Sequence, residues 1–243
     1  MVPRLDRCVG SLSLDDQLRV ERALCQRFRE HAPVYLSQVE LRYLTSAWLE
    51  LVVMQHYGAP TRLLDWSKSP WIALFFAVSE SFDTDGFVYG FSRSELENSA
   101  IAVARKKLPN LVCGPHRDLP FSDEAWDHAE INTDLLDPTL AATLPKWVVT
   151  YYCRVGHFPR LIAQQGLFTF ASKPGTDHWQ QIMRYAPSSF VLRIKKPAKQ
   201  EILRELNVIG INAATLFPGI EGVSKSLEGF ARAWPLFPRP PQF

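Results

Sequence analysis

The chain has 243 residues, of which 47% are hydrophobic and 21% are charged, and its net charge is +2. This composition excludes extensive disorder, because disordered chains combine low hydrophobicity with high net charge. It also argues against duplex DNA as a partner, since proteins that bind duplexes usually present a basic face and only local clusters such as 105–107 are basic here.

The four cysteines lie far apart and form no C-x-x-C pair, so we expect reduced thiols and a cytoplasmic protein. Cys113, His116 and Asp118 are the one local set with ligand chemistry. No second ligand pair at zinc-finger spacing accompanies them, so no metal site is predicted. We expect no membrane association, because the chain lacks a run of about twenty apolar residues and a signal-like N-terminus.

Apolar residues recur at helical spacing from Leu18 to Val53, which predicts two helices divided at Pro33, the first capped by Ser13. A loop is expected over 56–68. Ser69 and Pro70 then supply a cap and a first-turn proline for a helix over 70–78. Because that helix is apolar on all sides, it is expected to be the buried centre of the fold.

Strands are predicted at 86–92, 161–163, 166–171 and 189–194, and helices at 197–206 and 220–234. The proline-containing stretch 98–147 is expected to form loops with short helices, and 235–243 an extended tail. The order of elements predicts an α+β domain over 1–234, in which N-terminal helices precede a mixed, mainly antiparallel sheet around the buried helix.

The most informative segment is 55–67, Gln-His-Tyr-Gly-Ala-Pro-Thr-Arg-Leu-Leu-Asp-Trp-Ser. Its tight turn can hold His56, Thr61 and Arg62 together beside the start of the apolar helix. The amides of Trp71 and Ile72 there would be open donors, so the segment could bind an anion. Two alternatives remain: Arg62 pairs with an acidic residue three positions on, or His56 is a hydrogen-bonded core residue.

The segment 55–67 resembles the signature of the FRG domain, a bacterial family named for a Phe/Tyr-Arg-Gly motif. Two later stretches, 160–169 and 214–222, are similar to further conserved parts of that family. The naming motif should precede the helical stretch 21–35 and does not occur there. We therefore expect a member that is short at its N-terminus or has lost that strand.

FRG domains in turn resemble ADP-ribosyltransferases in their order of elements, which implies an ADP-ribosyltransferase-like fold and NAD as cofactor. On this resemblance His56, Arg62 and Gln165 are the catalytic candidates. The wider set of ligand-binding candidates is Gln55, His56, Tyr57, Gly58, Thr61, Arg62, Asp65, Ser67, Gln164 and Gln165.

Such transferases need a carboxylate near the ribose, where a glutamine supplies no charge. Glu130, Glu201 and Glu221 are the candidate substitutes. The resemblance implies a small nucleotide ligand, and a protein target or a neighbouring defence component as partner, in a toxin or phage-defence system. The alternative is a non-catalytic module that binds a ligand or a protein.

Overall fold

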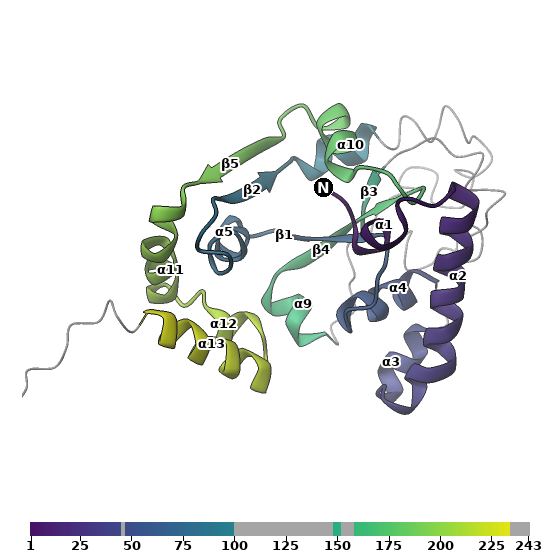
Figure 1. Ribbon diagram of the computed structural model, residues 1–243, viewed down its shortest axis with the longest axis horizontal. Helices are drawn as coiled ribbons and strands as arrows, with labels where there is room; N and C mark the ends of the chain where they lie inside the picture. The colour runs from purple at the N-terminus through teal and green to yellow at the C-terminus, as the bar shows by residue number, and fades with distance from the viewer. Residues whose placement is uncertain (45–46, 100–147, 152–157, 234–243) are drawn as a thin grey trace, which may run out of the picture. The chain divides into compact units, whose positions relative to one another are not determined.

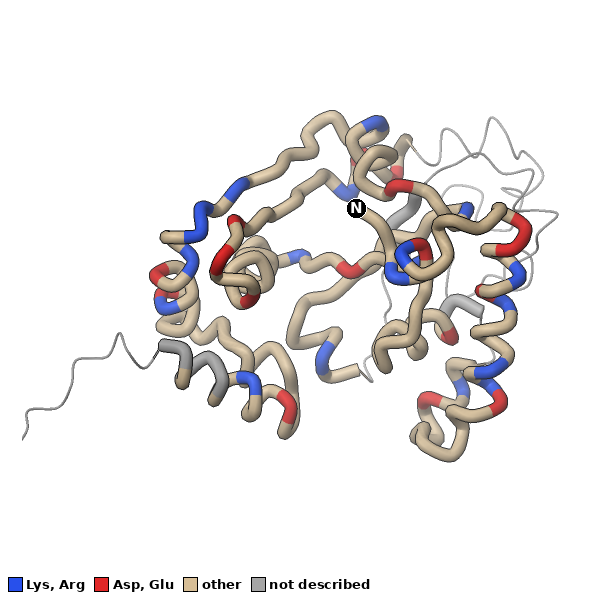
Figure 2. The backbone as a smooth tube through the Cα atoms, viewed as in Figure 1, with Lys and Arg blue, Asp and Glu red and all other residues tan. Residues whose placement is uncertain are grey.

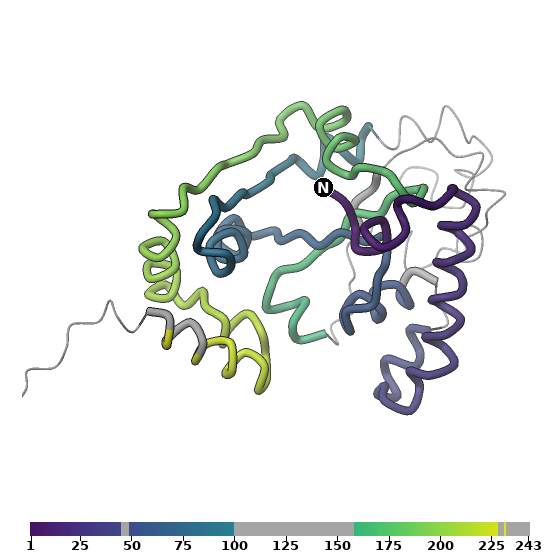
Figure 3. The backbone as a smooth tube through the Cα atoms, in the orientation of Figure 1, coloured from purple at the N-terminus to yellow at the C-terminus, as the bar shows by residue number. Residues whose placement is uncertain are grey.

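A computed structural model of the protein describes residues 1–44, 47–99, 148–151 and 158–233 (Figure 1). These residues form two compact units. Unit 1 contains 1–65, 91–99, 148–151 and 167–189, and unit 2 contains 66–90, 158–166 and 190–233. Successive segments of the chain alternate between the two units several times. Figure 3 traces the backbone from the N-terminus to the C-terminus by colour.

Unit 1 begins with helices, as the sequence predicts. They are α1 (Arg4–Val9), α2 (Leu14–His31), η1 (Ala32–Val34), α3 (Gln38–Tyr43) and α4 (Ala47–His56). The predicted cap is confirmed, since the Ser13 hydroxyl accepts a hydrogen bond from the Asp16 amide at 3.2 Å. The prediction of two helices was too coarse, because a capping box at Ser37 and Glu40 starts α3 separately and α1 precedes Ser13.

A three-stranded sheet contains β1 (Leu63–Ser67), β4 (Gly166–Ala171) and β3 (Val148–Tyr151), in the order β1-β4-β3. β3 and β4 are antiparallel, with Val148 opposite Ala171. β4 was predicted and is confirmed, and every residue of it is buried. β1 was predicted as loop and β3 was not predicted. In unit 1 the chain continues from β4 into α10 (His178–Tyr185), which packs against β3.

Unit 2 contains α5, the antiparallel pair of β2 and β5, and a set of C-terminal helices. Its core consists of side chains from α5, β5, α11 and the α12 segment, which are Ile72, Phe75, Val78, Ile194, Leu206, Leu216 and Phe217. The elements are α5 (Pro70–Val78), β2 (Gly86–Gly90), α9 (Pro159–Ala163), β5 (Phe190–Ile194), η2 (Lys196–Ala198), α11 (Lys199–Val208), α12 (Ala213–Leu216) and α13 (Ile220–Ala233).

Two predictions for unit 2 are wrong. α5 is not buried on all sides, since Ile72, Phe75 and Val78 face the core while Trp71 and Phe76 are 55% and 43% exposed. The buried residues of α5 recur every three positions and so line one side of the helix. The opposite side is exposed although the whole helix is apolar. The stretch 161–163 is helix rather than strand, because Pro159 occupies a first-turn position and a short apolar run suits either structure.

The mixed α+β class with small antiparallel sheets is confirmed. Several predictions lie outside the described residues: the loops over 100–147, the set Cys113, His116 and Asp118, the carboxylate Glu130 and the tail 235–243. Within the part of the chain that the structure describes, no helix is long and apolar enough to cross a membrane.

Candidate functional site

The end of α4 shapes the first part of the candidate site. Gly58 has φ +79°, its amide donates to the Gln55 carbonyl at 3.0 Å, and the next amide donates to the Met54 carbonyl at 2.8 Å. This pair of bonds is the Schellman termination, which needs a residue with positive φ and so favours glycine. It leaves His56 half-buried and Tyr57 exposed, with their rings edge to face at 5.0 Å.

An arginine that the sequence motifs do not include joins this turn. The exposed Arg4 guanidinium of α1 donates to the Gly58 carbonyl, and the Leu5 amide donates to the Thr61 carbonyl at 3.1 Å. Among the described residues Arg4 forms no ion pair with a carboxylate. The turn formed by His56, Tyr57 and Gly58 therefore carries a cation from a segment about fifty residues earlier.

A row of hydrogen bonds leads from the interior of unit 1 to a carboxylate on its surface. The Thr61 hydroxyl donates to the Gln55 side-chain oxygen at 2.6 Å, and the Gln55 amide donates to the Asp65 carboxylate at 2.6 Å. Thr61 is buried, Gln55 is half-buried and Asp65 is exposed. The row fixes the Gln55 amide orientation and holds the Asp65 carboxylate in place.

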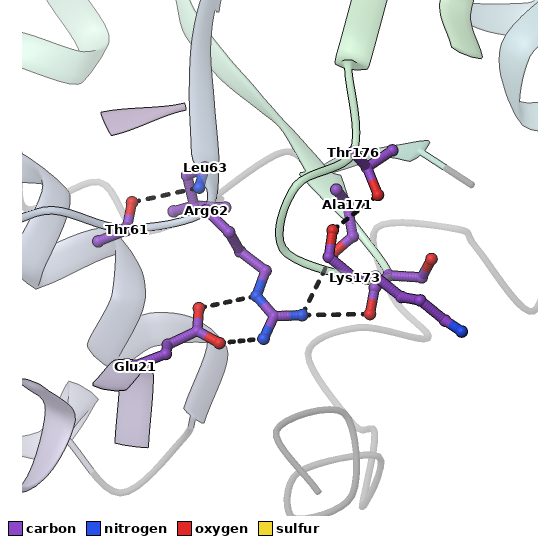
Figure 4. A network of polar contacts seen from close by, with 8 residues as sticks. Glu21, Thr61, Arg62, Leu63, Ala171, Lys173 and Thr176 are labelled. Carbon is purple, nitrogen blue, oxygen red and sulfur yellow. Dashed lines mark hydrogen bonds and ion pairs between the residues drawn. The ribbon is translucent and has the colours of Figure 1, made fainter. Parts of the chain in front are cut away.

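Arg62 lies inside unit 1 and has no exposed surface. Its Nε donates to Glu21 at 2.7 Å, its Nη2 donates to the second Glu21 oxygen, and its Nη1 donates to the Ala171 and Ser172 carbonyls at 3.4 and 3.2 Å (Figure 4). The guanidinium also lies 5.1 Å from the centre of the Phe170 ring. Its donors are thus used to connect α2 with β1 and the end of β4.

The alternative in which Arg62 pairs with Asp65 is wrong. The carboxylate that binds Arg62 is Glu21, 41 residues earlier, while Asp65 accepts from Gln55. Spacing within the motif could not reveal this partner, because the contact is made between distant parts of the chain. A buried charge needs such a partner, and the pair explains how an arginine can be buried completely.

Ser67, Gln164 and Gln165 form a second group, in unit 2. The Ser67 hydroxyl donates to the Gln164 carbonyl at 2.8 Å, and the Lys68 amide donates to the Gln165 carbonyl at 3.0 Å. The Gln164 side chain donates to the Leu216 carbonyl at 3.1 Å. Gln165 is exposed and has φ +47°, a conformation that non-glycine residues rarely adopt.

The start of α5 is capped as predicted, since the Ser69 hydroxyl accepts from the Ile72 amide at 3.4 Å and Pro70 begins the helix. The expectation that the Ile72 amide is an open donor is therefore wrong. The substitute carboxylates that the structure describes both have partners, because Glu201 pairs with Arg204 and Glu221 with Lys225.

The candidate residues thus lie in two groups. The first group belongs to unit 1 and lies at or near the end of α4, and it consists of Gln55, His56, Tyr57, Gly58, Thr61, Asp65 and the fully buried Arg62. Ser67, Gln164 and Gln165 belong to unit 2. Their joint action on one ligand stays a prediction. In the described parts of the chain, no group of three or more His, Cys, Asp or Glu side chains is placed to hold a metal ion.

Comparison with known proteins agrees with the motif. The model of the FRG domain family matches residues 1–86, a range that includes Arg4, Glu21 and the whole turn segment. The chain therefore contains an FRG domain, as the segment 55–67 predicts. No curated protein and no solved structure matches the chain. The likeness to ADP-ribosyltransferases stays a prediction.

Proposed function

We propose that this FRG domain binds a ribose-containing nucleotide, ADP-ribose or NAD, on the surface around the end of α4. The observation that carries the proposal is the hydrogen bond from the exposed Arg4 to the Gly58 carbonyl, which places a cation at the turn that contains His56 and Tyr57. A carboxylate fixed by the same helix end, Asp65, supports it. Arg4 thus supplies a cation, the Asp65 carboxylate supplies a hydrogen-bond acceptor, and the rings at the turn supply aromatic surface.

Each group suits one part of such a ligand. An arginine forms charge-assisted, bidentate hydrogen bonds with phosphate oxygens, so Arg4 is assigned to the diphosphate. A carboxylate accepts hydrogen bonds from ribose hydroxyls, as in dinucleotide-binding folds, so Asp65 is assigned to the ribose. Tyr57, with more than half of its surface exposed, and the ring of His56 offer aromatic surface to a base.

Arg62 has a positioning role in this proposal and contacts no ligand. Its bonds to Glu21 and to the end of β4 hold the start of β1, the strand that contains Asp65 and follows Thr61. The candidate ligand contacts in the motif are therefore those on the surface, and Arg4 of α1 is added to them. Loss of Arg62 would act through loss of structure.

Calorimetric titration of the full chain with ADP-ribose and with NAD tests the proposal. Arg4→Ala should weaken binding about tenfold or more, because a hydrogen bond to a charged group contributes about 1.5–3 kcal/mol. Arg7→Ala, an exposed arginine of the same helix, is the matched control and should change affinity less than about twofold. Absence of binding by the unaltered protein would refute the proposal.

NAD-dependent ADP-ribosyl transfer is the second candidate, and the fixed Asp65 carboxylate is the observation that favours it. In that reaction the bond between nicotinamide and ribose breaks, and the ribose then bonds to a nucleophile of the target, which loses a proton. A carboxylate stabilises the cationic ribosyl centre, which the neutral Gln164 and Gln165 cannot do. A toxin or phage-defence role belongs to this candidate.

Measurement of nicotinamide release separates the candidates. Binding of NAD without release identifies a non-catalytic module, whereas release that is lost in Asp65→Asn identifies a transferase. Release that persists in Asp65→Asn would exclude this carboxylate as the stabilising group. His56 and Gln165 stay catalytic predictions for the same assay.

A further inference from the structure

The antiparallel pair of β2 and β5 in unit 2 presents a face that the proposed nucleotide site does not use. Phe87 lies opposite Arg193, and Tyr89 lies opposite Val191. Directly opposed side chains of an antiparallel pair share a face, and side chains alternate along each strand. Phe87, Tyr89, Val191 and Arg193 therefore lie on one face of the ribbon, which we term the aromatic face.

The other face of the ribbon contributes to the core of unit 2. Ile194 is buried, Val88 packs against the core cluster, and the Phe190 ring covers Gly90 closely enough to exclude a Cβ atom there. On the aromatic face Phe87 is 48% and Val191 is 47% exposed and Tyr89 is half-buried, while on the other face Phe190 and Leu192 are 57% and 53% exposed. Val88 and Ile194 thus anchor the ribbon to the core of unit 2, and both of its faces expose apolar side chains.

Cations continue from this face along the chain. Arg193 is on it, and the exposed Lys195 and Lys196 follow directly, as the blue segments from β5 into α11 show in Figure 2. One carboxylate, Asp85, accepts from Arg193 at 2.6 Å and from the Lys196 amide at 2.8 Å, and lies 3.9 Å from Lys195. Three cations against one carboxylate leave an excess of positive charge.

Asp85 also fixes the geometry of this cationic end. The bonds from the Lys196 amide and from Arg193 lower the pKa of Asp85, so it stays charged and holds the guanidinium of Arg193, the residue opposite Phe87 in the ribbon. Lys199, the next lysine, is buried and donates to the Glu80 and Ser81 carbonyls, so it stabilises unit 2 and adds nothing to the charged surface. The surface charge therefore comes from residues 193–196.

We propose that the aromatic face of the β2–β5 ribbon binds single-stranded nucleic acid. Unpaired bases stack on aromatic side chains and on arginine planes, and phosphates are neutralised by neighbouring cations, the combination present at Phe87, Tyr89, Arg193 and Lys195. An acidic peptide would engage the cations but leave the two rings unused. In a duplex the bases are already paired and stacked, so the two rings could not stack on them. The small net charge of the chain also argues against a duplex partner.

Fluorescence anisotropy with a labelled oligo(dT) of about 15 nucleotides tests the proposal on the full chain. Phe87→Leu, which keeps an apolar side chain and removes the ring, should weaken binding at least about fivefold. The double variant Arg193→Gln with Lys195→Gln should weaken binding further and reduce the salt dependence. Each neutralised cation should change the slope of log K against log salt by about 0.7.

Arg204→Gln is the matched control, because Arg204 is an exposed arginine of α11 that is not part of the ribbon and pairs with Glu201. It should leave both affinity and salt slope unchanged. Three results would overturn the proposal. The chain fails to bind the oligonucleotide, or Arg204→Gln loses as much affinity as the ribbon variants. The third is that loss of Arg193 and Lys195 weakens binding to anionic lipid vesicles but not to the oligonucleotide. Titration with ADP-ribose is independent of all three.

Discussion

Glu50 provides a sharp test of the packing between α2 and α4. Its side chain is 3% exposed, and its carboxylate lies 3.0 Å from Nε of the half-exposed Arg29. The same N–H donates to the Cys25 carbonyl at 3.4 Å, so the carboxylate has an ion-pair contact without a well-aligned hydrogen bond. Burial raises the pKa of Glu50 from 4.5 to about 7, and Arg29 opposes this only in part.

The raised pKa means that the folded chain favours neutral Glu50. The stabilisation is complete below the unfolded value of 4.5 and is lost as the pH rises through the folded value of about 7. With about 1.4 kcal/mol for each tenfold difference in acidity, ionisation costs about 3 kcal/mol in full. Between about pH 5 and pH 8 the loss is about 2.5 kcal/mol.

Glu50→Gln mimics the neutral carboxyl and should remove this pH dependence. Urea denaturation from about pH 5 to pH 8 should give nearly equal free energies of unfolding at the acidic end, with the variant more stable by about 2 to 3 kcal/mol at the alkaline end. Glu30→Gln, an exposed glutamate of α2, is the matched control and should show no such trend. A constant difference between Glu50→Gln and the unaltered chain would refute the reasoning.

Three further substitutions test other contacts by urea denaturation at constant pH. Arg62→Met leaves Glu21 buried without its partner and should cost about 3–5 kcal/mol, and a loss below about 1 kcal/mol would contradict the role given to the pair. Gly222→Ala places a Cβ atom against the Phe217 carbonyl oxygen, closer than such atoms can pack, and should cost at least about 1 kcal/mol, whereas unchanged stability would contradict this close packing. Lys199→Met removes a buried ammonium that binds two carbonyls and should cost about 1–3 kcal/mol, whereas unchanged stability would show that those carbonyls find other partners.

Local signals in the sequence predicted several elements correctly. Ser13 and Ser69 cap helices where expected, and β4 and β5 follow runs of aromatic and branched residues. β1 was missed because its five residues neither alternate nor form a long apolar run, and its pairing with β4 is a contact between distant parts of the chain. Such pairing cannot be read from a short window.

The same distinction explains the candidate site. The motif identified the turn at Gly58, because the Schellman termination depends on adjacent residues. It could not identify Glu21 as the partner of Arg62, nor bring Arg4 to the turn, because both contacts cross more than forty residues of sequence. A short helix with apolar Leu5 and Val9 four apart was the one available signal for α1.

Calorimetric titration of Arg4→Ala beside Arg7→Ala with ADP-ribose tests whether Arg4 binds the diphosphate, because both variants remove one exposed arginine from the same short helix. If Arg4 binds the diphosphate, the unaltered chain and Arg7→Ala bind ADP-ribose with nearly equal affinity, and Arg4→Ala binds it at least about tenfold more weakly. Equal affinity of the two variants, or no binding by the unaltered chain, would contradict it.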